Sequence, residues 1–384
     1  MAISMKRSKR KYSGKQIIKA GEKLIRENIQ DDEKAFSAAM DILSYWRFNH
    51  EEPLDFAFKL LQELIPKKDN TAIFAKRLKR YPSIIAKLKR FDKMKLKNMQ
   101  DIGGCRAIVS NKKKLQQVVR ELRKRPEFKN TEGKIRAKNY VDKPKEDGYR
   151  GYHLVGQFSN KEGEKMDIEV QVRTVLQHDW ATALEIVDLF TGQALKSNQG
   201  DKDWKVFFAS VSEQFAIMEE IHMFNKLSDQ DKFTEYLKEL NKDDQHMSGC
   251  RKTQDYCQRL NVIKKLNAFA VSLKFVDTKL GENGGRGYVL IEINTEKNTG
   301  KATMFKEENS AEAEAMYTEV EKASAKDKHL VVALVSSTAV GGIKEAYPNY
   351  FADSTDFTKY LHLICDAQVK RKDGVFSNLF NWKK

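Results

Sequence analysis

Residues 166–174, MDIEVQVRT, alternate apolar and polar side chains. Alternation with a period of two predicts a β-strand that buries one face. Its polar face carries two carboxylates, an amide and a guanidinium: Asp167, Glu169, Gln171 and Arg173. Such a face is either solvated surface, which is the commoner case, or the wall of a site that handles phosphate and metal. This stretch alone leaves both interpretations open.

A further carboxylate, Asp101, lies two residues before Gly103 and just ahead of a predicted strand, CRAIVS, at residues 105–110. A carboxylate at this point can hold Mg²⁺, which prefers one or two carboxylates together with phosphate oxygens. The alternative is an acid that ends a helix, followed by turn glycines. Asp101 is therefore a candidate metal ligand.

Two basic stretches supply cations for phosphate. The first, at residues 76–90, gathers lysines and arginines around a turn-like YPS, and its alternative interpretation is a solvated helix face. The second, VDKPKEDGYRGYH at residues 141–153, sets Lys145 and His153 beside tyrosines, which offer flat rings for base stacking. Its alternative interpretation is an ordinary Pro/Gly turn between strands.

Hydrophobic periodicity predicts the elements that position these residues. Strands interleaved with helices over roughly the first 225 residues indicate an α/β or α+β domain of catalytic type. The expected helices lie at residues 14–65, 71–91, 112–125, 175–190 and 205–224, and the expected strands at residues 105–110, 152–159 and 165–174.

A different module is expected after one long polar helix at residues 228–276. It begins with a hairpin around TEKNTG and continues with a helix at residues 310–325, a strand at residues 329–337 and a final helix. This order predicts a small antiparallel sheet with helices on one face.

Composition limits the class of protein. The chain has 384 residues, 40% of them hydrophobic, which indicates folded domains. Its formal charge is +16 and its pI is near 9.4. Four cysteines form no CxxC pair, and no segment approaches the roughly 20 apolar residues of a membrane span. We therefore expect a cytoplasmic protein with no membrane partner and no zinc site.

Four motifs, in this order and spacing, resemble the synthetase domain of the RelA/SpoT homologue family over roughly residues 40–225. They are R-x-K-R-x-x-S-I-x-x-K-L, D-I-x-G-x-R, P-K-x-x-G-Y-R-x-Y-H and E-V-Q-V-R-T-x-x-Q-H-x-W-A. The resemblance implies an α+β fold, in which helices flank a mixed, nucleotidyltransferase-like β-sheet. It also implies transfer of pyrophosphate from ATP, with Mg²⁺, to a ribose 3′-hydroxyl. The polar strand face at residues 166–174 is then expected to be a site wall.

The resemblance implies a role for each matching residue. Asp101 and Glu169 are expected to be catalytic and to hold Mg²⁺, with Glu169 either a metal contact or the general base for the 3′-hydroxyl. Tyr149 is expected to stack on the acceptor base. The residues expected to bind ATP are Arg77, Lys79, Arg80, Lys87 and Arg106. The residues expected to bind the acceptor are Lys145, Tyr149, His153, Gln171 and Arg173.

Two other functional classes compete with this interpretation. A metal-dependent hydrolase would be built around a His-Asp pair, and His178–Asp179 is such a pair, but it lies inside the synthetase motif. A non-catalytic RNA-binding module would not need Asp101 and Glu169. Charge-neutral substitution of these two residues therefore separates an enzyme from a binding module.

The family has two kinds of acceptor. Alarmone synthetases modify GDP or GTP, whereas toxic small synthetases modify the 3′-terminal adenosine of tRNA. Residues 1–250 hold 49 Lys and Arg against 37 Asp and Glu, and this excess favours tRNA, because a long polyanion gains from each released counterion. GDP or GTP stays the alternative acceptor.

The second module, which carries KEAYPNYF, resembles the CapRel branch of the family, a fused toxin–antitoxin. The resemblance implies a toxin domain at residues 1–227, a helical linker at residues 228–276 and a regulatory, antitoxin-like domain at residues 277–384 that senses a phage protein. Tyr347 and Tyr350 are then hypothesised to close the ATP site. The alternative is a local role in which one ring covers the small domain's core and the other lies on its surface.

Overall fold

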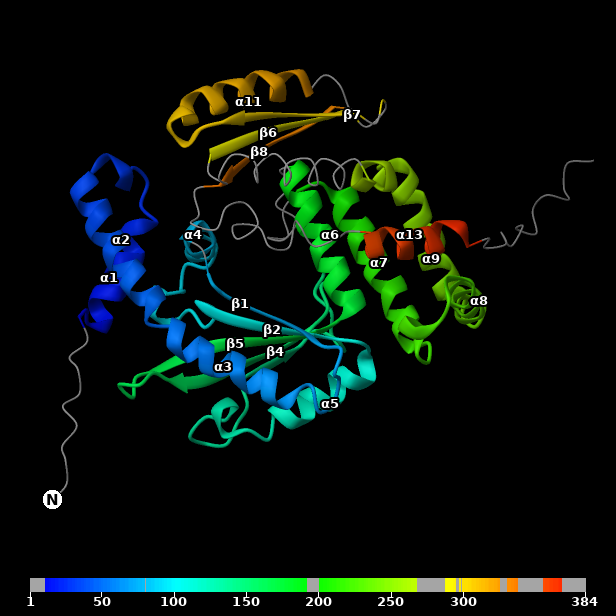
Figure 1. Ribbon diagram of the computed structural model, residues 1–384, viewed down its shortest axis with the longest axis horizontal. Coiled ribbons are helices and arrows are strands. Elements are labelled where there is room, and N and C mark those ends of the chain that lie inside the picture. The colour runs from blue at the N-terminus through cyan, green and yellow to red at the C-terminus, as the bar shows by residue number, and fades with distance from the viewer. Residues whose placement is uncertain are drawn as a thin grey trace, which may run out of the picture. The chain divides into compact units, whose positions relative to one another are not determined.

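The computed structural model of the chain falls into two compact units, and each is described by itself (Figure 1). Unit 1 comprises residues 1–144 and 150–175, and unit 2 comprises residues 145–149 and 176–384. The described residues are 11–79, 81–191, 200–267, 287–294, 297, 299–324, 330–337 and 355–367.

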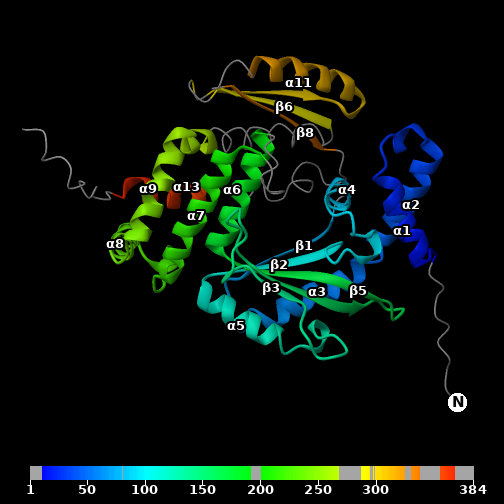
Figure 2. The ribbon, with the colours of Figure 1, turned by 180° about the vertical axis from the view of Figure 1, so that it is seen from behind.

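Unit 1 contains a five-stranded sheet in the order β1-β2-β5-β4-β3, with β3 at the edge beside β4 (Figure 2). β2 and β5 are parallel, and the other three pairs are antiparallel. The sheet is therefore mixed, which confirms the predicted α+β class, and the strands predicted at residues 152–159 and 165–174 are β4 and β5, an antiparallel pair. The strands are β1 (Ile73–Leu78), β2 (Gly103–Val109), β3 (Ala137–Asn139), β4 (Tyr152–Ser159) and β5 (Lys165–Thr174).

One face of this sheet is covered by α3 (Glu51–Leu64) and α5 (Lys112–Leu122), which bury the apolar side chains of the strands in one core. Val170 and Val172 of β5 are fully buried there. Because strand side chains alternate between faces, the polar residues of β5 must point to the opposite face. The strand predicted from the alternation at residues 166–174 is confirmed.

A second core of unit 1 positions α4 (Tyr81–Arg90). Ile84 and Leu88 of this helix are buried with apolar residues of α1 and α2, and Lys87 lies between them in the sequence. The remaining helical elements of the unit are α1 (Gly14–Leu24), η1 (Ile29–Asp31), α2 (Glu33–Phe48), η2 (Leu96–Asn98) and η3 (Pro126–Phe128).

The prediction of one helix over residues 71–91 is wrong in its first half. Residues 73–78 form β1, which pairs antiparallel with β2, and the helix begins only at Tyr81. Pairing with the otherwise open edge of β2 gives hydrogen-bond partners to the backbone N–H and C=O groups of residues 73–78. The helical periodicity of the segment does not prevent this pairing. Pro82, near the first position of α4, favours a helix start at this point.

Unit 2 contains a group of helices: α6 (Val175–Thr191), α7 (Lys202–Glu220), η5 (Phe224–Lys226), α8 (Asp229–Leu240), α9 (Asp244–Arg259) and α13 (Thr355–Asp366). The prediction of one long polar helix from residue 228 is wrong, because α8 ends at Leu240 and Asp243 caps a new helix through its side chain. Asp is favoured at the N-cap of a helix, so Asp243 starts a second helix and divides the predicted segment into two.

Unit 2 also contains the predicted small antiparallel sheet, in the order β7-β6-β8, which is confirmed together with its helix and with the final helix α13. Its elements are β6 (Gly287–Asn294), β7 (Thr299–Phe305), η6 (Glu307–Asn309), α11 (Ser310–Ser324) and β8 (Leu330–Ser337). The domain boundaries predicted after residues 227 and 276 stay predictions. No helix among the described residues has the length and apolar character needed to cross a membrane.

Candidate active site on the polar face of the sheet

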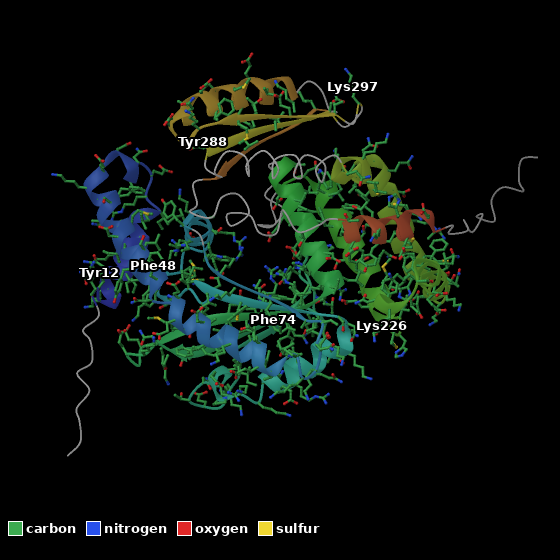
Figure 3. The ribbon with its side chains drawn as sticks, in the orientation of Figure 1. Tyr12, Phe48, Phe74, Lys226, Tyr288 and Lys297 are labelled. Atoms are coloured by element: carbon green, nitrogen blue, oxygen red, sulfur yellow. The ribbon has the colours of Figure 1, made fainter. Side chains whose placement is uncertain are left out.

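The candidate site lies on the sheet face of unit 1 opposite α3 and α5. Phe74 of β1, labelled in Figure 3, packs edge-on against Phe58 of α3, with ring centroids 6.5 Å apart. Arg77, three residues further along β1, therefore points to the opposite face. Strand register places Arg77 beside Gly104, and Gly104 beside Glu169. This row crosses three strands on the polar face.

Gly104 leaves that row open. A Cβ built on Gly104 would find only the Glu169 carbonyl oxygen, at 3.8 Å, within contact distance. The space between Arg77 on β1 and Glu169 on β5 is therefore not filled by a side chain of the strand between them. A phosphate chain running across the strands would meet a guanidinium at one end and a carboxylate at the other.

Both carboxylate oxygens of Glu169 have hydrogen-bond partners on its own sheet. His153 Nδ1 lies 3.0 Å from Oε1, and Gln171 Nε2 donates to Oε2 at 2.7 Å. The buried Arg173 in turn donates through Nη2 to Gln171 Oε1 at 3.0 Å. Three residues predicted to bind the acceptor are therefore arranged around Glu169, and they fix its orientation.

The environment of Glu169 keeps the carboxyl ionised. Burial alone would raise its pKa, but the hydrogen bond and charge of His153, the Gln171 hydrogen bond and the charge of Lys87 outweigh it and lower the pKa to about 2. A carboxylate with so low a pKa has little affinity for a proton. Of the two roles expected for Glu169, this favours the metal contact over the general base.

The stability of unit 1 should depend on the charge of Glu169 in acid. Its folded pKa of about 2 lies below the ordinary value of 4.5, so the stabilisation is present above pH 4.5 and is lost as the pH falls toward 2. We expect the difference in unfolding free energy between wild type and Glu169→Gln, measured by urea unfolding, to shrink below pH 4.5. A difference that stays constant down to pH 3 would contradict the assigned hydrogen bonds.

Asp101 has two ammonium partners. Lys79 Nζ lies 3.0 Å from Oδ2, and Lys87 Nζ lies 2.9 Å from Oδ1. Burial would raise the pKa of Asp101, but the charges and hydrogen bonds of these lysines lower it below its usual value. Lys79 is itself fixed, because its backbone N–H donates to the Ile102 carbonyl and its carbonyl accepts from Arg47 Nε. The structure thus brings together three residues predicted for the site, Asp101, Lys79 and Lys87.

The other residues expected to bind ATP lie at different points of the chain. Arg106 stands on the polar face of β2, where the register places it between Ala75 of β1 and Gln171 of β5. Arg77 is exposed on β1. Arg80, also expected to bind ATP, lies outside the described residues.

The second acid on the strand, Asp167, has a structural partner. Arg136 holds it with two parallel hydrogen bonds, Nη1 to Oδ2 and Nη2 to Oδ1, each 2.7 Å long. In this bidentate geometry each carboxylate oxygen of Asp167 accepts one hydrogen bond from Arg136. The polar face of β5 therefore has a structural end at Asp167 and a candidate functional end from Glu169 to Arg173. The sequence gives no signal for Arg136, because its pairing depends on how a distant loop returns to the sheet.

Lys145 and Tyr149, predicted to bind the acceptor, belong to unit 2. Gly148 precedes Tyr149 with a φ of +87°, and a Cβ there would approach the Ala209 Cα of α7 to 2.8 Å. Only glycine suits this position, because it adopts positive φ without cost and lets the loop lie against the helix. The Tyr149 ring meets Trp180 edge-on at 6.4 Å, and Lys145 Nζ lies 4.6 Å from its centroid.

The His178–Asp179 pair, on which a hydrolase would depend, lies on α6 of unit 2. Burial, and secondarily the charge of Asp356, raises the pKa of Asp179 to about 7. A carboxyl that is half protonated near neutral pH is a poor metal ligand. This environment favours a structural role for Asp179.

The chemistry of Asp101 and Glu169 fits Mg²⁺. Mg²⁺ keeps several waters and is commonly held by one or two carboxylates together with substrate phosphates. Two ionised carboxylates of unit 1, Asp101 in the turn before β2 and Glu169 on β5, meet that requirement. Within the part of the chain that the structure describes, no group of three or more His, Cys, Asp or Glu side chains could hold a metal without such phosphates.

Comparison with known families bears directly on this face of the sheet. Residues 76–186, which span β1 to most of α6, match the family described as "Region found in RelA / SpoT proteins". Residues 76–186 are named the RelA/SpoT region here, after the family that they match. The matched residues include Asp101 and the polar face described above, with Glu169 and Arg106, and so support the resemblance seen in the four motifs.

A curated relative is GTP pyrophosphokinase YjbM of Bacillus subtilis (strain 168), which is 33% identical over 111 residues. The match covers 28% of this chain and 51% of the relative, so the chain spans about half the length of the curated relative it matches. The match therefore extends over less than a third of this chain.

Solved structures of similar proteins include small alarmone synthetase 1 of Bacillus subtilis bound to its product pppGpp, with a TM-score of 0.40 and 22% identity. The match covers 46% of this chain and 93% of that one. A GTP pyrophosphokinase family protein from Streptococcus pneumoniae has a TM-score of 0.38 and 21% identity, covering 50% of this chain and 97% of that one.

Proposed function

We propose that the chain transfers pyrophosphate from ATP to a ribose 3′-hydroxyl. The observation that carries the proposal is the polar sheet face of the RelA/SpoT region, where an oriented carboxylate, Glu169, and a lysine-bound carboxylate, Asp101, lie among cations. The name of the curated relative, GTP pyrophosphokinase, supports the same reaction class.

The reaction forms a bond between the 3′-oxygen and the β-phosphorus of ATP and breaks the bond between that phosphorus and the bridging oxygen to the α-phosphate, releasing AMP. The 3′-hydroxyl proton is lost as the new O–P bond forms and is taken up by the phosphate oxygens of the products or by the buffer, while Glu169 stays ionised. Phosphoryl transfer needs little covalent help from the protein, and placement of charge and alignment of the acceptor oxygen supply most of the catalysis.

The chain's own residues would divide this work. Asp101 and Glu169 would hold Mg²⁺, which when bound neutralises charge on the phosphate oxygens. Arg77, Lys79, Lys87 and Arg106 would bind the phosphates and adenine of ATP. His153 and Gln171 would keep Glu169 oriented and ionised. Their predicted role in acceptor binding stays a prediction beside this positioning role.

For the acceptor, we propose the 3′-terminal adenosine of tRNA. Residues 1–150, which hold most of the RelA/SpoT region, contain 39 Lys and Arg against 19 Asp and Glu. Exposed lysines and arginines gain affinity for a long polyanion from each counterion released, whereas a single nucleotide engages only a few of them.

GDP or GTP is the second candidate acceptor, and the name of the curated relative, a GTP pyrophosphokinase, favours it. Incubation with [β-³²P]ATP and equimolar tRNA, GDP or GTP separates the two candidates. Label in tRNA, lost on removal of its 3′-terminal adenosine, supports the first acceptor, and label only in guanosine nucleotides contradicts it.

We further propose that the region after residue 276 restrains the enzyme as a fused antitoxin until a phage protein binds it. Tyr347 and Tyr350, the residues hypothesised to close the ATP site, lie outside the described residues, and the proposal depends on the resemblance of KEAYPNYF to the CapRel branch. A partner that prefers the released state would shift the population toward activity.

This restraint predicts constitutive activity after Tyr347→Ala or Tyr350→Ala. Each variant should stop growth of a bacterium that expresses it without any trigger, because the tethered ring no longer competes with adenine. Growth curves after induction provide the measurement. Normal growth with wild-type protein levels would contradict autoinhibition, and addition of Asp101→Asn to each variant should restore growth if toxicity is enzymatic.

A further inference from the structure

Asp101, one of the two carboxylates proposed to hold Mg²⁺, contacts two lysines. Lys87 Nζ lies 2.9 Å from Asp101 Oδ1, while Lys79 Nζ occupies Oδ2 at 3.0 Å. Both oxygens of Asp101 are therefore engaged by ammonium groups. A divalent cation that bound Asp101 directly would have to displace at least one of them.

Lys87 is partly buried where it meets Asp101. Its side chain is only 25% exposed, so its charge is screened less than that of a surface lysine.

Lys87 differs from Lys79 in exposure. Both lysines have flexible four-carbon side chains, but the Lys87 side chain is 25% exposed and the Lys79 side chain 16%. Lys87 therefore has more room to leave Asp101 for a phosphate.

We propose that Lys87 is a tethered counter-ion that takes the place of Mg²⁺ at Asp101 until a nucleotide arrives. The nucleotide-free protein then binds divalent cations weakly, and the metal enters together with ATP, whose phosphates attract Lys87 away. Lys87 is in this role a positioning residue. The inference rests on the proposed function, because that function assigns the metal to Asp101 and Glu169.

The test is a titration of the nucleotide-free, full-length protein with Mn²⁺, followed by the loss of the free-ion EPR signal. Lys87→Met keeps the length of the stem and removes the charge. We expect it to bind one Mn²⁺ at least about tenfold more tightly than wild type, because a repelling charge a few ångströms away is removed. Lys89→Met, on the same helix and exposed, is the matched control and should match wild type.

Two further variants locate the effect. Lys87→Met combined with Asp101→Asn should lose the gain in Mn²⁺ affinity, and a gain that persists would overturn the proposal by placing the ion elsewhere. Equal affinities in wild type and Lys87→Met would overturn it as well. If circular dichroism shows that Lys87→Met does not fold, Lys87→Gln takes its place in the same titration.

The Mn²⁺ titration and the proposed function can fail separately. Absence of pyrophosphate transfer with every acceptor would refute the function, yet the titration would still show whether Lys87 excludes a cation. Transfer by the wild type with no change of Mn²⁺ affinity in Lys87→Met would refute only the counter-ion role. Transfer activity alone cannot replace the titration, since Lys87 is also proposed to contact phosphate.

Discussion

Asp101→Asn is expected to lower pyrophosphate transfer by roughly a thousandfold, because loss of a metal-holding carboxylate removes several kcal/mol of charge stabilisation from the transition state. Asparagine keeps the shape of the side chain, so the fold should persist. Loss of the bonds to Lys79 and Lys87 should lower the unfolding free energy by about 1.5–3 kcal/mol. Steady-state kinetics and urea unfolding give the two quantities.

The strand β5 offers a matched pair of variants for this prediction. Glu169→Gln should reduce turnover about as much as Asp101→Asn, whereas Asp167→Asn makes the same chemical change two residues away on the same face. Asp167 is held by Arg136, so its variant should lose some stability and keep its turnover. Near wild-type turnover in Asp101→Asn or Glu169→Gln, or strong loss in Asp167→Asn, would show that the site is wrongly assigned.

Tyr149→Ala is expected to lower kcat/KM for the acceptor by about 10–100-fold, because stacking on a base contributes roughly 1–3 kcal/mol. The KM for ATP should change much less. Within unit 2 the variant also loses the ring contact with Trp180 and the cation above the ring, so its stability must be measured beside its kinetics.

The control for this prediction is Tyr149→Phe, which keeps the ring and removes only the hydroxyl. Tyr149→Phe should recover much of the acceptor kcat/KM. Equal losses for ATP and acceptor in Tyr149→Ala, in a protein that remains folded, would remove Tyr149 from the acceptor pocket. A large loss in Tyr149→Phe would show that the hydroxyl and not the ring acts.

Much of unit 1 follows from sequence patterns. The alternation at residues 166–174 correctly predicts β5 and its buried and polar faces, and the hairpin to β4 follows from the turn residues between them. β1 could not be predicted in this way, because its burial is slight and its pairing with β2 is decided by a distant strand edge. The strand propensity of a segment's residues does not show which other strand that segment will pair with.

The members of the candidate site can be predicted from the sequence, but their arrangement cannot. Residue type and motif are enough to single out Asp101, Glu169 and the basic residues. That His153 and Gln171 bind Glu169 depends on strand register, and that Lys87 reaches Asp101 depends on where α4 packs. Residue type alone does not separate Asp167 from Glu169; the motif does, and the structure adds the physical reason, because Arg136 binds Asp167.

The transfer of intact pyrophosphate is tested most directly by following two labels of ATP in parallel. With [α-³²P]ATP the label should appear in AMP, and with [β-³²P]ATP it should appear in the acceptor, in equal amounts over time. Both signals should vanish in Glu169→Gln and persist in Asp167→Asn. Release of labelled ADP from [β-³²P]ATP, or β-label that never enters tRNA, GDP or GTP in the absence of the Tyr347 and Tyr350 restraint, would contradict the account.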